Sequence, residues 1–93
     1  MKIDVIHYVK WQDIAEEFGW KENDVNFLVN AENHSYIEFR TDFHAIIDLE
    51  DSIEYAKTFN RLEAIARYQN ELKLIKYFNS FGHSDKVLIF YTW

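Results

Sequence analysis

Apolar and polar residues alternate with a period of two near the start of the chain. Over residues 2–9, Ile3, Val5 and Val9 fall on one side of this alternation. The period and the β-branched content predict a β-strand. The alternative is a helix that begins in the same segment, because a second set of residues has helical spacing: Tyr8, Trp11, Ala15 and Phe18.

The next segment has the period of an amphipathic helix. Its apolar residues occupy positions i, i+3, i+4 and i+7: Trp11, Ile14, Ala15 and Phe18. This spacing predicts a helix over 11–18, and Gly19 is the residue type that commonly ends one. Glu16 and Glu17 lie off the apolar face.

Alternation returns in the middle of the chain. Val25, Phe27 and Val29 alternate with polar and apolar neighbours, and a second alternating run covers 35–40. Two such runs around a short polar connection predict a β-hairpin. A third alternation over 43–49 is expected to extend the hairpin into a meander.

A long helix is predicted to begin at Asp51. Asp51 and Glu54 have the spacing of a capping box, with Asp in place of Ser or Thr. The apolar stripe that follows comprises Tyr55, Phe59, Leu62, Ile65, Tyr68, Leu72, Ile75 and Phe78. A helix from Asp51 to the residue before Gly82 would be about 45 Å long. Because this is long for a domain of this size, we expect a bend near Asn60. The final apolar run, 87–91, predicts a strand with neighbours or cover on both faces.

These elements follow one another in the order βαββ(β)αβ. The order predicts a single α+β domain over 1–93, with a mainly antiparallel sheet and two helices on one of its faces. It resembles the element order of ferredoxin-like domains, in which the other face of the sheet stays open. No motif supports this resemblance, and a fold does not by itself give a function.

The distribution of charge narrows the class of partner. The chain has a net charge of −6. Residues 1–54 hold 13 acidic and four basic residues, whereas residues 55–93 hold three acidic and six basic ones. An acidic domain is a poor candidate for binding DNA or RNA, because contacts to phosphate dominate that affinity. The acidic part is instead expected to attract a protein with a basic surface.

Several classes of site are not supported by the sequence. The chain has no Cys, and its four His (His7, His34, His44 and His83) have no metal-binding spacing. No serine has a nucleophile-elbow setting, and two isolated Gly do not form a phosphate-binding loop. Glu71-Leu72-Lys73 resembles the end of a metal-nuclease signature only weakly. We therefore expect no enzyme activity, no metal site and no cofactor.

The N-terminus lacks the pattern of a signal peptide, and no apolar run is long enough to span a membrane. A cytoplasmic location without membrane contact is the expectation.

The open face of the predicted sheet is the first candidate binding surface. The alternation places on it Ile6, Tyr8, Leu28, Tyr36, Glu38, Arg40 and alternate residues of 87–93. Aromatic and aliphatic residues with a few charges are typical of an interface core with a polar rim. Tyr8, Tyr36 and Glu38 are the residues that we expect to contact a partner. The alternative is that this face is covered, either by another part of the chain or by a second copy in a homodimer.

The acidic residues form the second candidate surface. They are Asp42, Asp48, Glu50, Asp51 and Glu54, together with the pair Glu16 and Glu17. One interpretation is a solvated face that only maintains solubility. The sharper hypothesis is a surface that imitates the phosphates of a nucleic acid and occupies a basic cleft.

The sequence thus favours stoichiometric binding to a protein partner, as an inhibitor or regulator. Toxin-neutralising immunity proteins and viral inhibitors of host defence nucleases, anti-CRISPR proteins among them, are functional classes of similar size and charge. The competing hypothesis is a homodimeric structural or small-ligand-binding module.

Overall fold

A computed structural model describes residues 7–30 and 35–91 of the chain. The elements appear in the order β1 (His7–Lys10), α1 (Trp11–Phe18), η1 (Glu22–Asp24), η2 (Phe27–Asn30), β2 (Tyr36–Arg40), α2 (Phe43–Thr58), α3 (Leu62–Ser80) and β3 (Lys86–Phe90), where η denotes a 3₁₀-helix. The fold is α+β, as predicted from the sequence.

The three described strands form one mixed sheet in the order β1–β3–β2. β3 lies in the centre, parallel to β1 and antiparallel to β2. The continuous apolar run at the end of the chain therefore forms the central strand, as its pattern predicts. The expected mainly antiparallel sheet is only roughly right, because one of the two pairings is parallel.

The helix predicted over 11–18 is confirmed. It begins at Trp11 and ends at Phe18, and Gly19 follows with a φ of 70°. This left-handed conformation is one that Gly adopts without a steric cost. Trp11 and Ile14 are buried, and Glu16 and Glu17 are exposed, as the helical spacing predicts.

The hairpin predicted from 25–29 and 35–40 is wrong in its first half. β2 confirms the second alternating run, but it pairs with β3 and not with 25–29. Phe27–Asn30 forms a 3₁₀-helix, and Val25 is buried outside any strand. Residues 2–6 of the first predicted strand, and the connection 31–34, lie outside the described residues.

The strand predicted over 43–49 is also wrong. These residues form the start of α2, whose N-cap is Asp42. The Asp42 carboxylate accepts a hydrogen bond from the Ala45 backbone N–H over 3.0 Å, which satisfies one of the free donors of the first turn. Asp51 consequently lies inside the helix and caps nothing.

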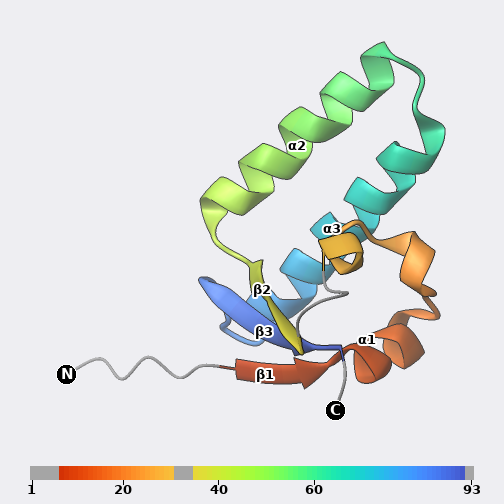
Figure 1. The fold of residues 1–93 in the computed structure, drawn as a ribbon. Helices are drawn as coiled ribbons and strands as arrows, with labels where there is room; N and C mark the ends of the chain where they lie inside the picture. The colour runs from red at the N-terminus through yellow and green to blue at the C-terminus, as the bar shows by residue number, and fades with distance from the viewer. Residues whose placement is uncertain (1–6, 31–34, 92–93) are drawn as a thin grey trace.

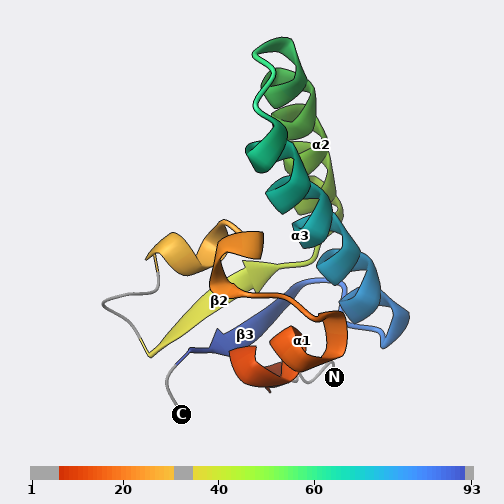
Figure 2. The same cartoon turned by 90° about the vertical axis from the view of Figure 1, so that its right-hand side faces the viewer.

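The predicted long helix is broken where a bend was expected. α2 ends at Thr58 and α3 begins at Leu62, and Asn60 between them has a φ of 54°. Asn tolerates this left-handed conformation better than most residues, so the chain reverses there. α2 and α3 form an antiparallel hairpin that projects from the sheet (Figures 1 and 2). With three α-helices and three strands in the described residues, the ferredoxin-like order is not reproduced.

The core lies between one face of the sheet and the helices. Phe39, Val87 and Ile89 point from the sheet into this core, and Leu74, Ile75 and Phe78 enter it from α3. Trp11, Ile14, Val25 and Leu28 complete the cluster. Leu28 is therefore a core residue, contrary to its predicted place on the open face of the sheet.

Candidate protein-binding surfaces

The side of the sheet away from the core carries the aromatic residues predicted for it. In the register of the strands, Tyr8 and Glu38 both oppose Leu88, and Lys10 and Tyr36 both oppose Phe90. Since paired residues point to the same side of a sheet, these side chains share one face. The expectation that Tyr8, Tyr36, Glu38 and Arg40 lie together is thus fulfilled in the geometry.

Three aromatic rings form a row across this face. The Phe90 ring on the central strand lies 5.7 Å from the Tyr8 ring and 5.4 Å from the Tyr36 ring, measured between centroids. Tyr8 is 59% exposed and Tyr36 is 46% exposed. Contacts of this kind stabilise the row, yet both tyrosines keep accessible area for a partner.

Charged residues surround the aromatic row and are largely paired. Glu38 lies 3.9 Å from Lys86, and Arg40 lies 3.0 Å from Asp42. The hydrogen bond from Arg40, followed by that from the Ala45 N–H, lowers the pKa of Asp42 below its ordinary value. Asp42 is therefore occupied as a helix cap and ion-pair partner, which leaves it less suited to a partner than the sequence alone predicts.

The other predicted acidic residues of this region lie on one broad side of α2. Asp48, Glu50, Asp51 and Glu54 are all exposed. Successive residues of a helix turn by about 100°, so these four cover an arc of about 160°. Glu54 lies 3.5 Å from Lys57. In the described part of the chain, the other three have no ion-pair partner.

Apolar side chains are interspersed with these acids. Phe43 is 70% exposed, Tyr55 is 63% exposed and Ile47 is 37% exposed. Their positions in α2 fall within or beside the acidic arc. We refer to Phe43, Ile47, Asp48, Glu50, Asp51, Glu54 and Tyr55 as the outer face of α2.

The tip of the hairpin adds exposed apolar residues that sequence reasoning missed. Phe59 is 55% exposed and Leu62 is 75% exposed, and the Phe59 ring lies 4.9 Å from that of Tyr55. The Arg61 guanidinium lies 6.0 Å from the Phe59 ring centroid. The apolar spacing predicts Phe59 and Leu62 on the buried stripe of one helix. The signal that would have exposed them is Asn60, which marks a turn.

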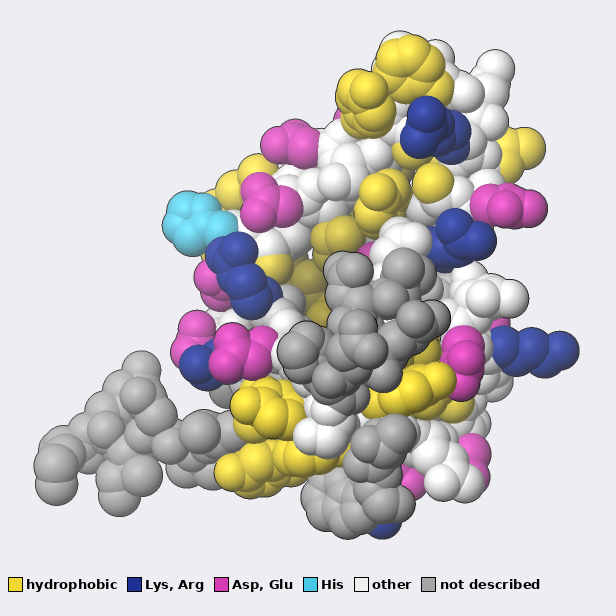
Figure 3. Space-filling model, viewed as in Figure 1, with side chains coloured by type: hydrophobic (Ala, Val, Ile, Leu, Met, Phe, Trp, Pro, Cys, Tyr) yellow, Lys and Arg dark blue, Asp and Glu magenta, His cyan; other side chains and the backbone are white. Residues whose placement is uncertain are grey.

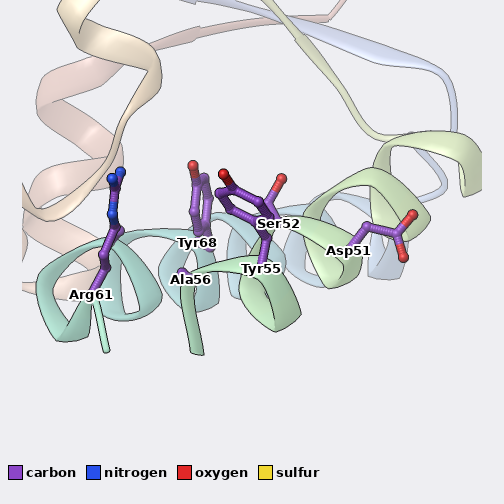
Figure 4. A pocket seen from close by; sticks show the side chains of 7 residues that line it. Asp51, Ser52, Tyr55, Ala56, Arg61 and Tyr68 are labelled. Carbon is purple, nitrogen blue, oxygen red and sulfur yellow. The ribbon is translucent and has the colours of Figure 1, made fainter. Parts of the chain in front are cut away.

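A groove of about 370 Å³ lies between α2 and α3 next to the tip. It is lined by Asp51, Ser52, Tyr55, Ala56, Arg61, Ala64 and Tyr68 (Figure 4). Ala56 and Ala64 are small, and Figure 4 shows the hydroxyl groups of Tyr55, Tyr68 and Ser52 on the same side of the hairpin. The groove presents hydrogen-bonding groups and two aromatic rings.

Glu16 and Glu17 do not join the acids of α2. Both are exposed on α1, which lies at the opposite end of the molecule from the tip of the hairpin (Figures 1 and 2). Glu16 accepts a hydrogen bond from the Gln12 side chain over 3.5 Å. The predicted acidic residues therefore form two separate groups, of which the α2 group is the larger.

The titratable residues offer no assembled metal site in the part of the chain that the structure describes. His44 is exposed next to Phe43, and the His83 carbonyl oxygen accepts a hydrogen bond from the Thr41 hydroxyl over 2.7 Å. His34 lies outside the described residues. Glu71, from the weak nuclease-like triplet, is buried in α3.

No protein-family model, curated protein or solved structure is significantly similar to this chain. In the described residues, none of the helices is both long and apolar enough to cross a membrane. The candidate surfaces are thus defined by geometry and chemistry alone.

Proposed function

We propose that this protein acts without catalysis, by stoichiometric binding to a protein that has a basic surface, as an inhibitor or regulator. One observation carries the proposal: the acids and the exposed apolar residues of the outer face of α2 occupy the same projecting hairpin. Figure 3 shows acidic side chains along the α2 side of the hairpin and hydrophobic ones at its tip.

The two kinds of residue have separate roles in this proposal. Exposed carboxylates attract a basic partner over distances comparable with the Debye length and raise the association rate. Aromatic and aliphatic side chains such as Tyr55 and Phe59 provide affinity when a partner covers them. A hairpin that projects from the body of the protein is able to enter a cleft that a flat face would not reach.

The recurrence of acids along α2 also supports the narrower idea of nucleic-acid mimicry. Asp48, Asp51 and Glu54 follow one another at three-residue intervals, which are about 4.5 Å apart along a helix. Such a row of negative charge suits a cleft that binds phosphates. Under this proposal the target is a nucleic-acid-binding protein, as it is for viral inhibitors of host defence nucleases.

Reversal of the acids on α2 tests the proposal. In the variant D48K/E50K/D51K, capture of the partner from a cell lysate is expected to be lost while the fold is retained. The matched control is D13K/E16K/E17K on α1, which changes the net charge equally at a remote place. Equal loss in both variants would show that only net charge matters, and retention in the first would contradict the proposed surface.

A homodimer, with a structural or small-ligand-binding role, is the second candidate. The aromatic row Tyr8–Phe90–Tyr36 supports it, because an isologous contact places such a row against itself. A mass of one chain by light scattering at both low and high salt would contradict it. A salt-resistant dimer that Y8A/Y36A converts to monomers would support it.

A further inference from the structure

Among the described residues, Glu71 is the only charged one that is buried. It lies in the middle of α3 and is only 6% exposed. Glutamate is rarely buried to this degree unless a cation pairs with it. Among the described residues, no cation lies within ion-pair distance of Glu71. Its carboxylate instead accepts hydrogen bonds from Asn26, through the side-chain amide over 3.4 Å and through the backbone N–H.

Asn26 belongs to a segment that crosses α3 and is fastened to it by side chains of that helix. We call residues 21–28, which include η1, the strap. The Arg67 Nε donates to the Asn23 carbonyl over 3.0 Å, and the Asn70 side-chain amide donates to the Asp24 carbonyl over 2.9 Å. Below these polar contacts, Val25 and Leu28 are buried in the core. Through Asn26, the strap thus contacts the buried Glu71 carboxylate.

The charged groups around Glu71 do not neutralise the negative charge of its ionised carboxylate. On its own helix, Arg67 lies 3.8 Å from Glu63 and is directed to the strap carbonyl. On the strap, Glu22 accepts from the Tyr91 hydroxyl over 2.9 Å, and Asp24 accepts from the Lys21 N–H over 2.7 Å.

Residues 25–28 carry no ionisable side chain. On α2, which also packs against α3, the charged residues are exposed acids and Lys57. The negative charge of an ionised Glu71 would therefore have only Asn26 to stabilise it.

Burial raises the pKa of Glu71 from 4.5 to about 7, and the hydrogen bonds from Asn26 oppose this rise only in part. The carboxyl group consequently changes its protonation near neutral pH. The neutral carboxyl group favours the arrangement in which it is buried, and the ionised carboxylate favours one in which water reaches it.

We propose that the strap is a pH-sensitive closure of α3, which stays shut over a protonated Glu71 and opens when Glu71 is ionised. Opening lets water reach the carboxylate at the cost of the contacts that Asn23, Asp24 and Asn26 make. Tyr68, which lines the groove, precedes Glu71 by one helical turn, so an open strap lengthens the groove along α3. This inference is independent of the proposed protein partner.

The size of the effect follows from the two protonation equilibria. With a pKa of about 7 in the closed state and 4.5 in water, the opening equilibrium constant rises about 30-fold between pH 5.5 and 8.5. Hydrogen exchange of single amides, measured by NMR and corrected for the intrinsic pH dependence of exchange, reports this constant. The informative amides are those of Asp24 and Asn26, with Ile75 and Ile89 as reporters of global unfolding.

In the wild-type protein, the strap amides are expected to open more readily than the core amides and to show the 30-fold rise. In Glu71→Gln the rise is expected to vanish, whereas Glu63→Gln, exposed on the same helix, retains it. A strap whose opening constant is unchanged over this pH range in the wild type would overturn the proposal. So would strap amides that exchange with the same constant as Ile75 and Ile89, since only global unfolding would then occur.

Discussion

At the scale of single residues, the most consequential finding is a carboxyl group in the core. Glu71 is buried beside Leu74 and Ile75, which are fully buried, and only Asn26 supports its charge. The local sequence does not separate this glutamate from the solvated ones, because its hydrogen-bond partner Asn26 lies 45 residues earlier in the chain. The burial of Glu71 was therefore not predictable from its local sequence.

The burial of Glu71 makes global stability depend on pH. Its pKa is raised in the folded protein, so the folded state binds the proton more tightly than the unfolded state. The free energy of unfolding therefore falls as pH rises from about 4.5 through about 7. We expect a loss of about 2 kcal/mol between pH 5.5 and 8.5. Asp42, whose pKa is lowered, loses its contribution only at more acidic pH.

Urea denaturation at several pH values measures this loss. In Glu71→Gln the slope between pH 5.5 and 8.5 is expected to flatten, and this variant should exceed the wild type in stability at pH 8.5. Parallel slopes in the two proteins would show that Glu71 is already solvated in the folded state.

At the scale of elements, local signals identified some segments and failed for others. The helix at 11–18 was predictable because its apolar spacing and Gly19 lie within the segment itself. The start of α2 was ambiguous, because Ala45 and Leu49 fit both a strand and a helix. What decides for the helix is the Asp42 cap together with burial of Ala45, Ile53 and Ala56 against α3.

The strap was missed for a different reason. The alternation of Val25, Phe27 and Val29, which begins within the strap, has the period of a strand. Its backbone carbonyls, however, accept hydrogen bonds from Arg67 and Asn70 on α3. Partners more than 40 residues away decide the conformation here, and no local pattern contains them.

The turn at Asn60 yields a prediction for the hairpin. Its φ of 54° is sterically strained for a residue that has a β-carbon but no side chain able to hydrogen-bond to the local backbone. Asn60→Ala is expected to destabilise the protein by about 1 kcal/mol, whereas Asn60→Gly should be neutral or stabilising. Thermal or urea denaturation compares the two variants. Equal stability of both would mean that Asn60 does not hold the left-handed conformation in solution.

At the scale of the whole molecule, the structure separates surfaces that the sequence combined. Tyr8, Tyr36 and Glu38 share the open face of the sheet, whereas Asp48, Glu50, Asp51 and Glu54 lie on the projecting hairpin. The solvent exposure of these residues was predictable from their charge and from the alternation. Their division between surfaces was not, since it depends on how α2 and α3 project from the sheet.

The most direct test of the central claim compares the two surfaces in one capture experiment. The protein is immobilised, and the bound partner is quantified by mass spectrometry for the wild type, for Y55A/F59A on the hairpin and for Y8A/Y36A on the sheet. We predict that the wild type captures a protein with a basic surface, that Y55A/F59A reduces its capture at least tenfold, and that Y8A/Y36A retains it. Loss with Y8A/Y36A and retention with Y55A/F59A would contradict the hairpin as the binding surface.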